Sequence, residues 1–274
     1  MTTAITAVLY PGHAAEDDYQ LIEDALGPSI RLPVVITEID SDDHTVGAMR
    51  AVGESDRLLD GAQRARTHDP AALMWACTSG SFLYGWEGAQ RQAAQLSEVA
   101  GLPASSTSLA FAEACRALGI DSVAVAASYP SDVAAGFTTF LAGADIEVVG
   151  MRANDILTAT DAGFIDGDTL FDMVVTADQP AAQAILIPDT ALHTATWIND
   201  LEAQVGKPVL TANQVTAWEG ARLAGATPRS DKLGALFSQT LLLQTQPVQT
   251  PPDQTQPAQV PSVPVRSDTP SRPR

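Results

Sequence analysis

The chain has 274 residues, of which 45% are hydrophobic and 18% are charged, and its formal net charge at pH 7 is −18. This length is enough to bury one large core or two smaller ones, and the excess of acidic residues argues against nucleic acid or an anionic membrane as a partner. A small anionic ligand is not excluded, because its binding depends on the few groups that line its site.

The two cysteines and four histidines limit the redox and metal chemistry that we expect. Two cysteines do not suggest a disulfide framework or a four-ligand zinc site, and the histidines lack the paired spacing of metal ligands, so we expect no metal. The N-terminus has no basic segment, and no apolar run reaches about 18 residues. We therefore expect a cytoplasmic protein that does not contact membranes.

Short apolar runs alternate with helix-compatible segments along the chain. Apolar runs bounded by turn residues are expected to form buried strands; they cover residues 5–10, 33–36, 71–76, 122–127, 146–150, 184–187 and 208–210, with one more short strand after Pro103. A helix is expected to start near Asp17 and Asp18, whose charges would complement its dipole. The other helices are expected over residues 46–67, 86–100, 109–118, 133–141, 155–160, 168–176, 194–205, 213–223 and 231–243. This alternation predicts parallel sheets covered by helices on both faces.

Two parts of the chain follow one plan: a strand, a reactive side chain followed by Thr, a helix, Gly-x-Pro, a short strand, a hydroxyl and a helix. The reactive side chain is Cys77 in the first part and Asp189 in the second. Ligands bind at the carboxyl ends of parallel strands. Two facing lobes of this kind would place Cys77 and Asp189 on opposite walls of one cleft.

We expect the first lobe to comprise residues 1–116 plus 213–243 and the second lobe to comprise residues 117–212. Residues 244–274 hold eight of the 18 prolines and no aromatic residue. Such a segment buries too little apolar surface to offset its ordering entropy, so we expect a disordered tail.

Cys77 ends the apolar run 71–76 and opens a Thr-Ser-Gly-Ser turn. A cysteine in this position lies near the first amides of the next helix, where a thiolate is stabilised. Cys77 is therefore a candidate nucleophile, and the alternative is a buried structural cysteine. Cys115, inside a predicted helix, is expected to be a small core residue.

The turn at residues 76–81, Tyr129 after the middle strand, and the run at residues 206–214 resemble the aspartate/glutamate racemase superfamily. Within it, the chain is most similar to the branch of maleate cis-trans isomerase and arylmalonate decarboxylase, over roughly residues 4–240. This resemblance implies an α/β fold of two pseudo-symmetric lobes with parallel four-stranded sheets flanked by helices. It also implies a cofactor-independent active site in the cleft between the lobes.

The resemblance assigns roles to several residues. It implies that Cys77 is the cysteine that adds to the substrate alkene in the isomerases, and that Tyr129 binds a substrate carboxylate. It places three hydroxyl residues where side chains and turn amides hold carboxylates, which fits the anion-binding property of such turns; these are Thr78, Ser79 and Thr190.

Two positions depart from the family pattern. Asp189 stands where these proteins usually have a second cysteine, and Ala14 stands where the isomerases have an asparagine. The decarboxylase shows the reverse of this chain, since it lacks the first cysteine and keeps the second.

These observations predict a cofactor-independent isomerase of the maleate cis-trans type that acts on a small mono- or dicarboxylic acid, with Cys77 as nucleophile and Asp189 as the second catalytic group. Three alternatives stay open: an arylmalonate-type decarboxylase in which Cys77 donates a proton, an amino-acid racemase-like enzyme, and a non-catalytic protein that binds a small acid. In the decarboxylase alternative, Asp189 is a structural helix cap. Members of this superfamily often associate, so a homo-oligomer is also possible.

Overall fold

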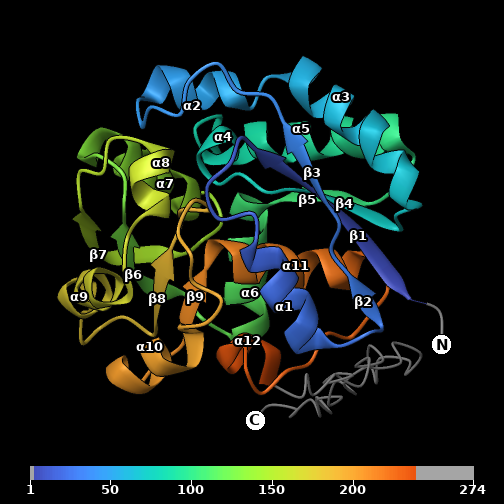
Figure 1. Cartoon of the computed structure of the whole chain (residues 1–274). Helices are drawn as coiled ribbons and strands as arrows, with labels where there is room; N and C mark the ends of the chain where they lie inside the picture. The colour runs from blue at the N-terminus through green and yellow to red at the C-terminus, as the bar shows by residue number, and fades with distance from the viewer. Residues whose placement is uncertain (1–2, 239–274) are drawn as a thin grey trace, which may run out of the picture. The chain divides into compact units, whose positions relative to one another are not determined.

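The structure is a computed structural model that describes residues 3–238 (Figure 1). Its strands are β1 (Ala4–Pro11), β2 (Ile30–Arg31), β3 (Val34–Thr37), β4 (Ala72–Trp75), β5 (Ala104–Ser106), β6 (Ser122–Ala127), β7 (Glu147–Ala153), β8 (Ala184–Ile187) and β9 (Val209–Thr211). Its α-helices are α1 (Asp18–Leu26), α2 (Val46–Val52), α3 (Ser55–Ala65), α4 (Ser79–Phe82), α5 (Gly85–Ala100), α6 (Thr107–Leu118), α7 (Ser131–Ala142), α8 (Ala159–Gly163), α9 (Gly167–Ala177), α10 (Ile198–Val205), α11 (Ala212–Leu223) and α12 (Gly234–Ser238). The predicted disordered tail, residues 244–274, lies outside the described residues.

All strand pairs in the two sheets are parallel, as predicted. The second sheet has the order β7-β6-β8-β9, and the first has the order β2-β1-β4-β5 with β3 also paired to β1. The first sheet therefore has five strands where four were predicted, because its edge is split: β2 pairs with the start of β1 and β3 with its end. Pro33 separates β2 from β3 and has no N–H to donate, but its carbonyl accepts a hydrogen bond from the Val8 amide, 2.9 Å away.

Three apolar clusters hold the sheets and helices together. In β1, Ala7 and Leu9 point to an outer cluster under α3 and α5, whereas Val8 and Tyr10 point to the largest cluster. The second sheet divides its strands in the same way, since alternate residues of a strand face opposite sides. The largest cluster takes side chains from the inner faces of both sheets and from α6, α7 and α11, which explains why α11 lies between the sheets in Figure 1.

The predicted helix over residues 46–67 is wrong in one respect, because it is two helices, α2 and α3, separated at Gly53 and Glu54. A Cβ atom on Gly53 would lie 2.0 Å from the carbonyl oxygen of Gly80. The Gln92 side-chain amide donates to the carbonyls of both glycines, at 2.8 and 2.9 Å. The break lets the end of α2 pack directly on the turn that follows Cys77.

Three predicted helices have different bounds. The helix expected at residues 155–160 begins only at Ala159, as α8: Asp155 has a φ of 53°, and Thr158 caps α8 by accepting a hydrogen bond from the Asp161 amide. The helix expected at residues 194–205 begins only at Ile198. The helix expected at residues 231–243 is α12, Gly234–Ser238, within the described part of the chain.

The described residues belong to one compact unit, so the lobe boundaries at residues 116/117 and 212/213 stay a prediction. Within residues 3–238, no helix combines the length and the apolar character that crossing a membrane requires.

The packing of α11 on the first sheet yields a prediction for Gly220. A Cβ atom there would lie 2.6 Å from Thr6 Cγ2 and 2.8 Å from Met74 Cγ, so we expect Gly220→Ala to lower the free energy of unfolding by about 1–3 kcal/mol through overpacking. Urea denaturation measures this change. The matched control is Gly47→Ala in α2, where no atom lies within 4 Å of the added Cβ. It should leave stability unchanged or raise it by up to about 1 kcal/mol through helix propensity; equal loss in both variants would contradict the packing argument.

Candidate active site

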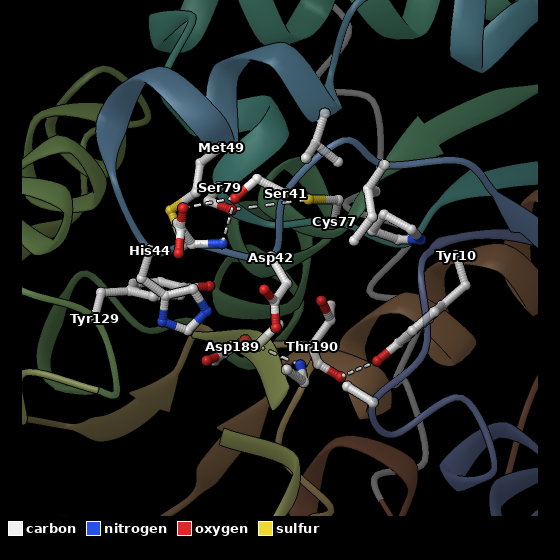
Figure 2. Close-up of a pocket in the computed structure, with 17 residues that line it drawn as sticks. Tyr10, Ser41, Asp42, His44, Met49, Cys77, Ser79, Tyr129, Asp189 and Thr190 are labelled. Carbon is white, nitrogen blue, oxygen red and sulfur yellow. Dashed lines mark hydrogen bonds between the residues drawn. The ribbon is translucent and has the colours of Figure 1, made fainter. Parts of the chain in front are cut away.

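The carboxyl ends of strands from both sheets meet at one pocket (Figure 2). Cys77 follows β4, Tyr129 follows β6, and Asp189 follows β8. The cavity has a volume of about 60 Å³. Six of the seven predicted site residues line it, namely Ala14, Cys77, Ser79, Tyr129, Asp189 and Thr190. The structure therefore brings the two reactive positions of the sequence repeat to one cavity, from different sheets.

Thr78 is the predicted residue that does not line the pocket. It is fully buried beside Cys77, and its hydroxyl has no hydrogen-bond partner among the described residues. Its carbonyl accepts a hydrogen bond from the Ser108 hydroxyl, 2.7 Å away, which fixes the backbone of the turn. Thr78 therefore lies behind the lining of the pocket and not in it.

The Cys77 thiol is enclosed by the single-turn helix α4. Its Sγ accepts a hydrogen bond from the Gly80 amide at 3.3 Å and lies 3.8 Å from Ser79 Oγ. Burial raises the pKa of this thiol to about 11, and the charge of Asp189 also raises it, whereas the Gly80 amide and the Ser79 hydroxyl lower it. The sequence suggested a stabilised thiolate at this turn, but the structure favours the neutral thiol, because desolvation outweighs the two hydrogen bonds.

Both oxygens of the Asp189 carboxylate are occupied by hydrogen bonds. Oδ2 accepts from the Ser128 hydroxyl, and Oδ1 accepts from the Ala191 amide at 2.9 Å. The side chain is buried. Asp189 thus stabilises the turn after β8; it does not cap a helix, because residues 190–197 form turns and α10 begins only at Ile198.

The two pocket tyrosines donate their hydroxyl hydrogens to backbone carbonyls. Tyr129 donates to Pro188 O at 2.8 Å, and Tyr10 donates to Thr190 O at 2.9 Å. Burial raises the pKa of both hydroxyls well above the usual range, and the charge of Asp189 adds to this. The carboxylate-binding role that the family resemblance implies for Tyr129 stays a prediction, since its hydrogen is directed to Pro188 in this structure.

The loop after β8 is held by groups from the other sheet's elements. The carboxylate of Asp18 accepts hydrogen bonds from the amides of Thr194 and Ala195, at 2.8 and 3.2 Å. Asn213 donates to the carbonyl of Thr190 at 3.1 Å. The sequence suggested that Asp18 serves the dipole of its own helix; instead it is buried and satisfies backbone amides 176 and 177 residues away.

Sequence reasoning missed the segment that forms another wall of the pocket. The sequence pattern predicts no site role for the stretch after β3, yet this segment and the following helix α2 contribute Ile39, Ser41, Asp42, Asp43, His44 and Met49 to the lining. Its position after the carboxyl end of a parallel strand was the signal that could have found it.

The pocket is acidic in character. Three aspartates line it, Asp42, Asp43 and Asp189, and His44 is the one basic side chain among the described residues that line it. Within residues 3–238, no group of three or more His, Cys, Asp or Glu side chains is arranged to hold a metal ion. The polar groups that line the pocket are a thiol, hydroxyls, carboxylates and one imidazole.

Comparison with known proteins gives a consistent result. Residues 49–237 match the family model described as arylmalonate decarboxylase. The chain is 29% identical over 212 residues to the arylmalonate decarboxylase of Bordetella bronchiseptica, which covers 76% of this chain and 88% of that protein.

Solved structures show the same fold. One is a liganded mutant of arylmalonate decarboxylase in which a glycine is replaced by cysteine and a cysteine by serine; its TM-score is 0.75 at 28% identity, over 86% of this chain and 99% of that chain. Another is the maleate isomerase of Pseudomonas putida, with a TM-score of 0.79 at 19% identity, over 86% and 99% of the two chains. The second likeness shows a shared fold alone. The chain therefore has the predicted α/β fold of this superfamily branch.

The charge of Asp189 contributes to the raised pKa of Cys77, and this predicts how a change at Asp189 alters the reactivity of the thiol. We expect Asp189→Asn to remove the negative charge and to lower the pKa of Cys77, so that alkylation by iodoacetamide at pH 8 becomes up to about tenfold faster, as one pKa unit allows. Peptide mass spectrometry measures the rate at each cysteine. Cys115 is the internal control, because burial alone raises the pKa of its thiol, to about 12. Equal acceleration at both cysteines would indicate loosened structure and contradict the electrostatic explanation.

Proposed function

The chain belongs to the arylmalonate decarboxylase family, and from this premise we propose that it decarboxylates a small malonate-type diacid without a cofactor, with the Cys77 thiol as the proton donor. The observation that carries the proposal is the enclosed thiol itself. Burial keeps it protonated at neutral pH, and a decarboxylation of this kind requires an acid next to the carbon that loses its carboxylate.

The proposed reaction balances with Cys77 as the acid. The bond between the central carbon and one carboxylate breaks, CO2 leaves, and the electron pair remains on the substrate as an enediolate. The Sγ–H bond of Cys77 then breaks as a C–H bond forms at the central carbon. Cys77 is left as a thiolate and regains a proton that comes ultimately from water, so each turnover consumes one proton.

The lining of the pocket supports two different surroundings for the two carboxylates. The Ser79 hydroxyl lines the pocket beside Cys77 and suits the carboxylate that becomes the enediolate, because donors aimed at developing charge stabilise it. Ile39, Met49 and Val52 form an apolar part of the wall. A carboxylate placed there is poorly solvated, which favours its loss as neutral CO2.

Cis-trans isomerisation of a small unsaturated diacid, with Cys77 as nucleophile, is the second candidate. It is favoured by the Gly80 amide, which donates to Sγ at 3.3 Å and so stabilises a thiolate. It requires Cys77 to lose its proton before reacting, which burial and the charge of Asp189 oppose. For this reason we place it after decarboxylation.

The test compares phenylmalonate with maleate as substrates for the full chain. We expect CO2 release from phenylmalonate, measured by a coupled bicarbonate assay, and a loss of about 10²–10⁴-fold in kcat for Cys77→Ala, because the positioned acid is removed. Cys115→Ala is the matched control: Cys115 is buried in α6 and does not line the pocket, so this variant should retain turnover.

The same assay separates the candidates. Conversion of maleate, followed by the loss of its absorbance, without CO2 release from any malonate would favour the isomerase. Undiminished CO2 release by Cys77→Ala would show that another group protonates the product.

A further inference from the structure

His44 is a buried imidazole whose orientation is fixed by the second sheet's elements. Its side chain is 4% exposed, and its ring packs edge-on against Tyr129 with 5.3 Å between centroids. The backbone amide of His44 donates to Leu157 O at 2.7 Å. Nδ1 lies 2.8 Å from the carbonyl oxygen of Ile156.

The hydrogen bond to Ile156 determines which ring nitrogen is available for chemistry. A carbonyl oxygen only accepts, so Nδ1 carries the hydrogen in this contact. Nε2 is then the nitrogen that gains or loses a proton, and no hydrogen bond to it is found among residues 3–238. His44 and Cys77 line the same cavity (Figure 2), and the charge of Asp42 also acts on the imidazole.

The proposed decarboxylation creates a need for such a group. After each turnover Cys77 is a thiolate, and the next turnover requires the thiol again. Because Cys77 is only 5% exposed, its proton has to arrive through a neighbouring group or through water in the cavity.

The aspartates and tyrosines of the pocket already make hydrogen bonds with other groups. Both oxygens of Asp189 accept hydrogen bonds from Ser128 and Ala191. The hydroxyl hydrogens of Tyr10 and Tyr129 are donated to backbone carbonyls. Asp42 Oδ2 accepts from the amide and hydroxyl of Thr160, and Asp43 Oδ2 accepts from the hydroxyl of Ser41.

We propose that His44 is the proton relay that returns Cys77 to its thiol form after each decarboxylation, an inference that rests on the proposed function. The Nε2–H bond of the imidazolium breaks and the Sγ–H bond forms, directly or through cavity water. The neutral imidazole then takes a proton from water, and Nδ1 keeps its bond to Ile156 throughout. No electrons are exchanged in either step.

The experiment separates the first turnover from the later ones. In His44→Asn the side-chain amide still donates to Ile156 O, but the variant has no Nε2. Rapid-quench measurement of CO2 from phenylmalonate should show a burst of one CO2 per chain at a rate within about twofold of the unmodified protein, because Cys77 begins as a thiol. Later turnovers should slow by about 10²-fold. His68→Asn is the matched control, since His68 is exposed and outside the pocket; it should show no change.

Each outcome decides the inference. A first turnover that slows as much as the later ones means that His44 acts in the chemical step or in the structure, which overturns the relay; so does unchanged steady-state turnover in His44→Asn. His44→Gln, with the same amide on a longer side chain, replaces the Asn variant if that variant fails to fold. Absence of CO2 release by the unmodified protein overturns the proposed function and the relay together, and it is seen before any variant is made.

Discussion

The site depends on a buried acceptor, the carboxylate of Asp18. This carboxylate accepts hydrogen bonds from the amides of Thr194 and Ala195. The side chains of Asn213 and Tyr10 both donate hydrogen bonds to the carbonyl of Thr190. These groups come from elements that pack with the first sheet, and the loop they hold follows β8 of the second. Buried backbone groups must be paired, so this network keeps Asp189 and Thr190 at the wall of the pocket that contains Cys77.

Enclosure and charge then set the chemistry of the thiol. A buried cysteine near a carboxylate, with His44 as the one basic side chain among the described lining residues, is held in its neutral form. A neutral thiol can donate its proton directly, whereas it must lose that proton before it acts as a nucleophile. The same position therefore suits an acid-catalysed decarboxylation more readily than an addition by thiolate, although the fold is shared with maleate isomerases.

The segment after β3 completes the pocket and connects its two sides. Its backbone pairs with residues 157–159 through His44 and Asp42, and Asp43 forms an isolated bridge with Thr158. The pairing of this segment with residues 157–159 also orients His44, because Ile156, whose carbonyl binds the imidazole, directly precedes the paired residues. One short stretch of chain therefore both lines the cavity and carries the residue that we propose as its proton relay.

The sequence alone determined the parallel α/β fold, the position of the strand ends and the two reactive positions, because strand periodicity and turn residues are local properties. The repeated strand ends indicated Cys77 and Asp189, whereas Tyr129 was indicated by the family resemblance. Only the tertiary structure decided that Asp18 binds a distant loop, that residues 46–67 form two helices, and that His44 faces the cavity. It also decided the protonation of Cys77, since desolvation depends on which residues surround the thiol from both sheets, and no local pattern encodes that.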